Sequence, residues 1–188
     1  GLRTLAVDLD PQGNLSDYFD VDPKAFPTVA EVLQGTANGA DAIHDDVMPA
    51  NLRLAEAELA LGGRMGRELS LKLALAKLDD SYDAILIDCP PSLGLLTVNA
   101  LVAADYALIT TEAQYFALHG VEQALAVIEA DRENLNPGIE WVGLVLNIAD
   151  LLTVHSREAL ASLKAAFDRQ VFEQVVRAPL SYDAPSRW

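Results

Sequence analysis

The sequence predicts an α/β fold with three layers, in which a mostly parallel, twisted sheet lies between helices on both faces. Strand-like apolar runs alternate with amphipathic helical segments along the chain, a pattern typical of a covered parallel sheet. Two of these runs end in an aspartate, at Asp8 and Asp88. The 188 residues, 51% of them hydrophobic, suffice for one sizeable core. We therefore expect a single domain over residues 1–188.

The first predicted elements are a strand and a short capped helix. The strand covers residues 3–8 and leads into a turn. Thr28 stands three residues before Glu31, which is the spacing of a capping box, and the helix that it starts is expected to end at Gly35. Residues 36–50 have the composition of a loop.

Two more elements are expected before the second main strand. Residues 52–55, Leu-Arg-Leu-Ala, predict a short strand. Residues 67–78 predict a helix, because Leu71, Leu75 and Leu78 fall on one face.

The rest of the chain continues the alternation of strands and helices. Strands are predicted over residues 84–88, 106–110 and 141–147. Helices are predicted over residues 93–103, along the apolar stripe Leu118, Val121, Leu125 and Ile128, and over residues 156–167.

Charge restricts the classes of function. A formal net charge of −15 argues against a broad basic face that would grip nucleic acid. The charge is uneven, because residues 1–150 hold 8 Lys/Arg against 24 Asp/Glu, whereas residues 151–188 hold 5 against 4. Any anion-binding surface is therefore expected late in the chain.

Other features of the composition concern location and completeness. Cys89 is the only cysteine, so an internal disulfide is impossible, and it is interpreted as a small core residue. The chain has no signal-like segment and no run of about 18 apolar residues, which predicts a cytoplasmic protein without a membrane span. Because the sequence enters a strand almost directly after Gly1 and stops at Trp188, we expect a fragment that is cut at both ends.

The chemical prediction depends on aspartates at the ends of strands. Asp8 and Asp10 are spaced one residue apart, which places them on one side of the first strand, and Asp88 ends the second. In parallel sheets, ligands bind beyond the carboxyl ends of the strands. A carboxylate fixed there can hold a water on Mg²⁺ or orient an attacking water in phosphoryl transfer.

These residues are assigned separate roles. Asp88 fits the Mg²⁺–water role, Asp10 is placed for the attacking water, and Asp8 is expected to support the metal shell. Pro90, in the loop after Asp88, has no N–H group and stiffens the loop beside the phosphates. The alternative is that each aspartate simply caps a turn. Two such strands, each with an unusual sequence after it, favour a site.

Five short motifs follow one another in a fixed order. They are Val7-Asp-Leu-Asp-Pro-Gln-Gly-Asn14, Tyr82-Asp-Ala-Ile-Leu-Ile-Asp-Cys-Pro-Pro-Ser-Leu-Gly94, Val98-Asn-Ala-Leu101, Tyr115-Phe-Ala-Leu118 with Gly120, and Ala184-Pro-Ser186. In this order they resemble the ParA/Soj partition ATPases, which are deviant-Walker P-loop proteins related to MinD. The resemblance covers nearly all of the chain.

The resemblance implies a P-loop NTPase-like fold with ATP and Mg²⁺ as cofactors. It implies that Asp10 activates the hydrolytic water and that Asp88 is the Walker B aspartate, which holds Mg²⁺ through water. Asn147 resembles the asparagine that contacts the nucleotide base in MinD-like relatives. An ordinary strand-end turn is an equally good interpretation of Asn147.

Partners and cellular role are also implied by the resemblance. Family members form homodimers on binding ATP, bind nonspecific DNA, and hydrolyse ATP faster with a ParB-like partner. Such a cycle segregates or positions a chromosome, a plasmid or other cargo, which implies a cytoplasmic, nucleoid-associated protein. Charged residues on helices are commonly only solvated, but the basic candidates for DNA binding are Arg157, Lys164, Arg169 and Arg177.

The sequence departs from the family in one important respect. It contains no Gly-x-x-x-x-Gly-Lys-[Ser/Thr] loop, which in the family precedes the segment where this chain begins. The first strand and the P-loop are thus expected to be missing, and the chain alone is expected to hydrolyse ATP poorly.

Three hypotheses explain this departure. The first is a partition ATPase truncated upstream, whose reading frame continues on both sides. The second is a nonenzymatic ParA-like adaptor that lacks a P-loop and begins with a genuine start codon near Gly1. The third is a related ATPase or amidotransferase synthetase, in which Asp10 and Asp88 serve ligation chemistry.

Overall fold

The computed structural model describes residues 1–78, 81–112, 117–147, 153–174 and 176. These residues form two compact units. The first unit consists of Gly1–Asp105 and Asp131–Pro137, and the second consists of Tyr106–Ala130 and the described residues from 138 onward.

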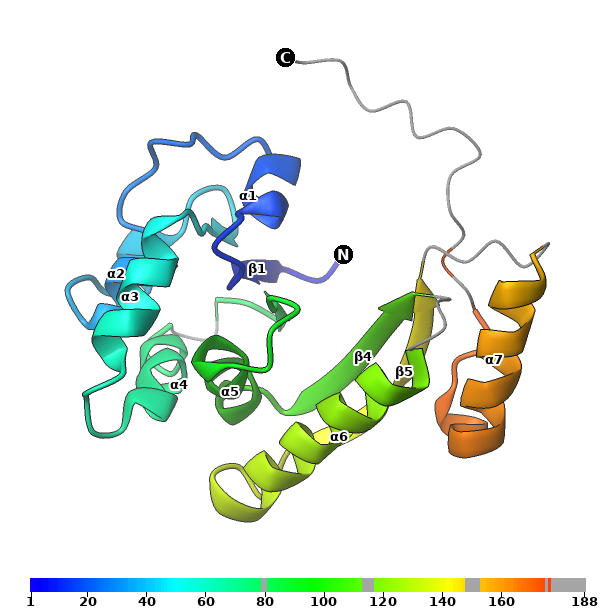
Figure 1. Cartoon of the computed structure of the whole chain (residues 1–188). Helices are drawn as coiled ribbons and strands as arrows, with labels where there is room; N and C mark the ends of the chain where they lie inside the picture. The colour runs from blue at the N-terminus through cyan, green and yellow to red at the C-terminus, as the bar shows by residue number, and fades with distance from the viewer. Residues whose placement is uncertain (79–80, 113–116, 148–152, 175, 177–188) are drawn as a thin grey trace. The chain divides into compact units, whose positions relative to one another are not determined.

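The first unit contains a three-stranded sheet in the order β2-β1-β3 (Figure 1). β1 spans Thr4–Asp8, β2 spans Val47–Met48 and β3 spans Ala84–Asp88. Both neighbours of β1 run parallel to it, and the register along β3 continues to the last pair, Asp8 opposite Asp88. The carboxyl ends of β1 and β3 are therefore level.

Helices of the first unit cover an apolar core that includes β1. Leu5, Val7 and Leu9 are fully buried in this core, together with leucines from α2, α3, α4 and α5. The helices are α1 (Asn14–Tyr18), α2 (Val29–Gln34), α3 (Arg53–Leu61), α4 (Ser70–Leu75) and α5 (Leu95–Ala103), with 3₁₀ turns at Ala40–Ala42 and Arg67–Leu69.

The capping box predicted at the start of α2 is confirmed. The Thr28 side chain accepts a hydrogen bond from the Ala30 N–H, and the Glu31 carboxylate accepts bonds from the Thr28 N–H and hydroxyl at 2.8 and 2.7 Å. Gly35 ends the helix with a left-handed φ of 70°. Both ends of this short helix are thus fixed by local sequence.

The second unit contains a parallel strand pair, which α6 and α7 flank in Figure 1. A register shift occurs opposite Ala107 and Leu108, where Gly143 has a φ of 145°. The Phe172 N–H donates to the Leu144 carbonyl, so the segment after α7 returns alongside β5. The elements are β4 (Tyr106–Glu112), α6 (Ala117–Asn134), β5 (Glu140–Asn147), α7 (Val154–Phe167) and a 3₁₀ turn at Asp168–Gln170.

Three local predictions require correction. Residues 52–55 are not a strand, because Leu54, Ala57 and Leu61 recur at helical spacing and form the buried face of α3. The loop predicted over residues 36–50 contains β2, whose two residues are defined by their pairing with β1. The helix predicted over residues 67–78 is a 3₁₀ turn followed by α4.

The predicted fold class is confirmed at the level of architecture. Every strand pairing between the described strands is parallel, and helices accompany both sheets. No helix in the described part of the chain combines the length and apolarity needed to span a bilayer. The assignment of residues 1–188 to one domain remains a prediction.

Candidate functional site

The structure brings Asp8 and Asp88 together at the carboxyl ends of β1 and β3. These two residues are opposite each other in the parallel register, and the backbone N–H of Leu9 donates to the carbonyl oxygen of Asp88 at 2.8 Å. Asp10 follows two residues after the end of β1. The sheet edge therefore carries one carboxylate on each of two paired strands and a third in the turn that follows β1.

Asp8 is the most constrained of the three. Its side chain has no solvent exposure, and its Oδ1 accepts a hydrogen bond from the Asp10 N–H at 3.0 Å. Its Oδ2 accepts bonds from the N–H and the hydroxyl of Ser16 at 2.9 and 2.7 Å. Asp8 thus ties the end of β1 to the first turn of α1, and a buried carboxylate is stabilised by such donors.

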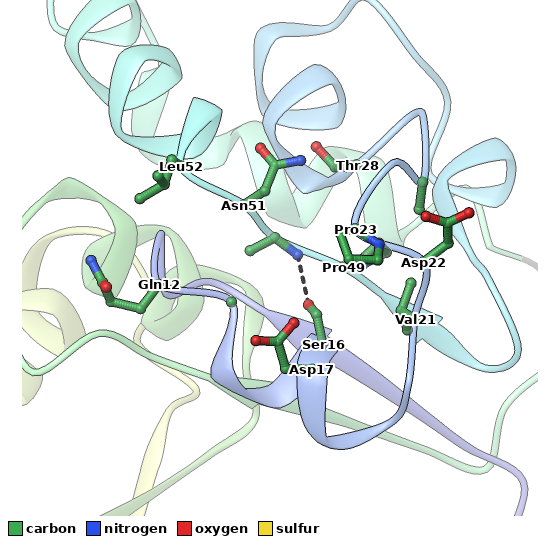
Figure 2. A pocket seen from close by; sticks show the side chains of 13 residues that line it. Gln12, Ser16, Asp17, Val21, Asp22, Pro23, Thr28, Pro49, Asn51 and Leu52 are labelled. Carbon is green, nitrogen blue, oxygen red and sulfur yellow. Dashed lines mark hydrogen bonds between the residues drawn. The ribbon is translucent and has the colours of Figure 1, made fainter. Parts of the chain in front are cut away.

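Ser16 connects this carboxylate to a second segment of the chain. Its hydroxyl oxygen accepts a hydrogen bond from the Ala50 N–H at 3.0 Å, which is the dashed line in Figure 2. Ser16 is itself only 5% exposed. One buried hydroxyl therefore joins the end of β1 to the segment that follows β2.

Asp10 lies in a tight turn. Its Oδ1 accepts a hydrogen bond from the Gln12 N–H at 2.9 Å, and its carbonyl accepts one from the Gly13 N–H at 2.9 Å. Gly13 has a φ of 69°, and a Cβ atom there would lie 3.0 Å from the Ala50 carbonyl oxygen. Among the described residues, Oδ2 of Asp10 has no hydrogen-bond donor, so this oxygen is left for a water or a ligand.

The electrostatics of the site favour a cation. Burial raises the pKa of Asp88, and the charges of Asp8 and Asp10 raise it further. In the described part of the chain, no lysine, arginine or histidine forms an ion pair with any of the three. A divalent cation would relieve this repulsion, and Mg²⁺ prefers carboxylate and water oxygens. The donor set fits an outer-sphere Mg²⁺ site completed by phosphate oxygens.

A pocket of about 130 Å³ adjoins the Asp10 turn. Gln12, Ser16 and Asp17 line one side of it, and Asn51 and Leu52 line the other (Figure 2). These two sides belong to the segments that the Ser16 hydroxyl joins, and residues between 21 and 28 complete the lining.

The other residues that the sequence singled out do not belong to the group of three aspartates. Pro90 is buried after β3, whereas Cys89 is exposed, so the interpretation of Cys89 as a core residue is wrong. Asn147 ends β5 in the second unit. Arg157 and Lys164 are exposed on α7, and Arg169 is exposed in the following 3₁₀ turn. Arg177 lies outside the described residues. Over the same described ranges, no set of three or more His, Cys, Asp or Glu side chains could hold a metal ion by itself.

Sequence reasoning missed two residues that organise this unit. Ser16 could have been recognised only as a hydroxyl in the first turn of a helix after an aspartate-tipped strand. Asn99 is fully buried in α5, where its Oδ1 accepts a bond from the Leu71 N–H and its Nδ2 donates to the Leu95 carbonyl. Asn99 belongs to one of the five motifs, and its role is to join α5 to the start of α4.

Comparisons with known proteins agree with this geometry. Residues 1–141 match the model of a family described as an AAA domain. The chain is 36% identical over 183 residues to the sporulation initiation inhibitor protein Soj of Bacillus subtilis (strain 168). The aligned region covers 94% of this chain and 72% of Soj. It is 37% identical over 181 residues to the chromosome partitioning protein ParA of Myxococcus xanthus (strain DK1622). This alignment covers 93% of this chain and 64% of that protein.

A solved structure is also similar along nearly the whole chain. Cobyrinic acid a,c-diamide synthase from Mycobacterium smegmatis, with bound ATP analogue and magnesium, superposes with a TM-score of 0.88. It shares 39% identity and covers 96% of this chain and 77% of that one. The match to Soj exceeds 30% identity over more than two thirds of both proteins, and the aspartate-tipped strands are paired as the motifs predict. The chain therefore belongs to the ParA/Soj family.

Proposed function

We propose that this chain is the greater part of a Mg²⁺-dependent ATPase of the partition type, which positions or segregates a chromosome, a plasmid or other large cargo. One observation carries the proposal. Asp8, Asp10 and Asp88 gather at the carboxyl ends of two paired parallel strands, and no cation in the described residues neutralises them. This is the place where α/β sheets bind ligands.

Each carboxylate has its own part in the proposal. Bound Mg²⁺ would neutralise charge on the phosphates of ATP. Asp88, at the end of β3, would hold that ion through a water molecule. Asp10 orients the attacking water with its free Oδ2. Asp8, whose oxygens are taken by Ser16 and the Asp10 N–H, sets the position of the Asp10 turn.

Further assignments rest on the family. We propose that Pro90 keeps the loop after Asp88 rigid beside the phosphates and that Asn147 contacts the base. Nucleotide-dependent homodimerisation, nonspecific DNA binding by a nucleoid-associated protein and stimulation by a ParB-like partner complete the proposed cycle. Relatives named as chromosome partitioning protein ParA support it. The DNA-facing candidates are Arg157, Lys164, Arg169 and Arg177.

The decisive experiment is Asp10→Ala in the longest reading frame that contains this chain. ATP hydrolysis with Mg²⁺ should fall at least about 100-fold, because a positioned group that handles the attacking water contributes about 10²–10⁴ to the rate. Binding of a fluorescent ATP analogue should change less than about threefold, since Asp10 is assigned no role in binding. Turnover and affinity are measured on the same preparation with and without DNA.

Glu56→Ala is the matched control, because Glu56 is an exposed acidic residue of α3 in the same unit, does not line the pocket beside the Asp10 turn and is hydrogen-bonded to none of the three carboxylates among the described residues. It should keep full turnover. If Asp10→Ala hydrolyses ATP at the rate of the unsubstituted protein, the assigned role of Asp10 is wrong. If even the unsubstituted reading frame binds no nucleotide, the chain functions as the nonenzymatic adaptor instead.

A second candidate function is favoured by the structural match to cobyrinic acid a,c-diamide synthase, which shares 39% identity with the chain. In that case ATP would activate a substrate carboxylate for amide formation. The two candidates differ in what accelerates turnover. A partition ATPase responds to DNA and a partner protein, whereas a synthetase responds to a carboxylic acid and an amide-nitrogen donor.

A further inference from the structure

A second pocket in the first unit has a charge opposite to that of the chain. It has a volume of about 300 Å³ and lies between the end of α2, the residues after it, and α4. Its lining includes Arg64 and Lys77 and no carboxylate. Residues 1–150 contain only 8 Lys/Arg against 24 Asp/Glu, so two cations with no acid are a marked departure from the local composition.

The two cations are available to a ligand. Arg64 uses one guanidinium nitrogen, Nη1, to donate to the Gln34 carbonyl at 2.8 Å, which anchors the side chain over the end of α2. Within the described ranges neither Arg64 nor Lys77 has a carboxylate within ion-pair distance. Ser70 lines the same pocket, and its hydroxyl has no hydrogen-bond partner among the described residues. These groups are all hydrogen-bond donors.

Much of the remaining lining is apolar, although Thr36 and Asn38 also line the pocket. Leu73 lines the pocket and is 60% exposed, although it stands on a helix whose neighbouring Leu71 is fully buried. Gly39 closes another side, where a Cβ atom would lie 3.2 Å from the Ala74 carbonyl oxygen. Ser70, Leu73 and Lys77 follow one another along the α4 segment, so a ligand in this pocket would meet hydrogen-bond donors and the Leu73 side chain together.

We propose that this pocket binds a small organic phosphate whose phosphate contacts Arg64, Lys77 and Ser70 and whose apolar part packs on Leu73. An arginine fork, a lysine point charge and a hydroxyl match the three terminal oxygens of a phosphate monoester. The volume lies at the lower end of the range for small-molecule pockets. None of the carboxylates of the aspartate site lines this pocket, so the proposal is independent of the proposed ATPase function.

The test is a titration of the ¹⁵N-labelled 188-residue chain with phenyl phosphate, followed by amide chemical shifts. Inorganic phosphate represents the anion alone, phenol the apolar part alone, and benzoate a different anion on the same ring. Phenyl phosphate should cause saturable shifts confined to residues 35–39, 64 and 70–77. Inorganic phosphate should bind about tenfold more weakly, because it lacks the contact with Leu73.

Two substitutions and one control make the test specific. Arg64→Gln and Lys77→Gln should each weaken phenyl phosphate binding about tenfold, since each removes a charge-assisted hydrogen bond. Lys72→Gln is the matched control, because Lys72 is also an exposed lysine of the α4 region but does not line the pocket. The Lys72→Gln variant should bind phenyl phosphate with the same affinity as the unsubstituted chain.

Three results would overturn the proposal. The first is the absence of saturable shifts up to about 10 mM phenyl phosphate, because a specific site should bind with a lower dissociation constant than this. The second is binding that survives in the double variant Arg64→Gln/Lys77→Gln. The third is binding of benzoate or phenol that is as tight as the binding of phenyl phosphate. The amide spectrum of each variant also reports whether it is folded.

Discussion

At the scale of single residues, the buried hydroxyl of Ser16 has a larger role than its size suggests. It donates to Asp8 and accepts from the Ala50 N–H, so three segments depend on one oxygen atom. Ser16→Ala should lower the free energy of unfolding by about 1–3 kcal/mol, because a buried carboxylate oxygen and a buried N–H both lose a partner. Urea unfolding followed by circular dichroism measures this change.

The control for Ser16 is Asp17→Asn in the same helix. Asp17 is exposed, and substitution there should change the unfolding free energy by no more than about 0.5 kcal/mol. Equal effects of the two substitutions would mean that the Ser16 network does not stabilise the fold.

Asp131 is a second residue whose burial affects the stability of the fold. It is 3% exposed, and within the described residues neither carboxyl oxygen has a hydrogen-bond partner. Burial raises its pKa, and the positive charge of Lys72 offsets part of that rise. Ionised Asp131 therefore destabilises the folded state at neutral pH.

Asp131→Asn should raise the free energy of unfolding at pH 7 by about 1–2 kcal/mol, because it removes a buried charge. The folded-state pKa lies above the unfolded value, so the unsubstituted chain regains this stability as the pH falls through the raised pKa. The difference between the two chains should therefore shrink toward pH 4. Glu133→Gln, at an exposed position of the same helix, should show no such pH-dependent difference.

At the scale of elements, the glycine in β5 determines how the chain returns along this strand. Gly143 has a φ of 145°, and a Cβ atom there would lie 2.6 Å from Phe172 Cε2 and 2.7 Å from the Gln170 carbonyl oxygen. Gly143→Ala should destabilise the protein by about 2–4 kcal/mol through backbone strain and overpacking. Thermal unfolding measures the effect.

Gly120 is the natural comparison for Gly143. It lies in α6, and a Cβ atom there has no neighbour within 4 Å. Gly120→Ala should therefore stabilise the protein by about 0.5–1 kcal/mol, because alanine loses less backbone entropy in a helix.

A double variant tests the crowding at Gly143. Adding Phe172→Ala to Gly143→Ala should recover only part of the lost stability, since the Gln170 carbonyl remains. A neutral Gly143→Ala would contradict the described close approach.

The elements also show which structural features the sequence could predict. The strand over residues 84–88 and the capping box of α2 were predictable, because a short apolar run and a helix cap both depend on neighbouring residues. β2 was not, since a two-residue strand exists only through its pairing with β1. Residues 52–55 were misassigned because a segment of four residues is too short to show helical spacing, and the spacing that reveals α3 extends to Leu61.

The same distinction applies to the aspartate site. The pairing of Asp8 with Asp88 followed from a parallel sheet with two aspartate-tipped strands. The separate roles of Asp8 and Asp10 could not be predicted in this way. β1 ends at Asp8, and Asp10 lies in a turn that a hydrogen bond to Asp8 holds in place. Which carboxylate is buried depends on Ser16 and Ala50, and these meet only in the folded chain.

At the scale of the whole molecule, net charge should control stability. A chain with a formal charge of −15 repels itself when folded, and salt screens this repulsion because the Debye length falls from about 30 Å at 0.01 M to about 3 Å at 1 M. The melting temperature should rise by about 3–6 °C between low and high NaCl, which corresponds to about 1–2 kcal/mol for a chain of this size. Differential scanning calorimetry in a non-chelating buffer measures this shift.

A charge variant separates this repulsion from other effects of salt. Glu133 and Glu173 are exposed, and Glu133→Lys with Glu173→Lys changes the formal net charge from −15 to −11 without touching either pocket or the aspartate site. Long-range repulsion falls with the square of net charge, so the salt-induced rise should shrink by roughly half. An undiminished rise would show that salt acts through apolar burial or ion binding, because those effects do not depend on these two surface positions.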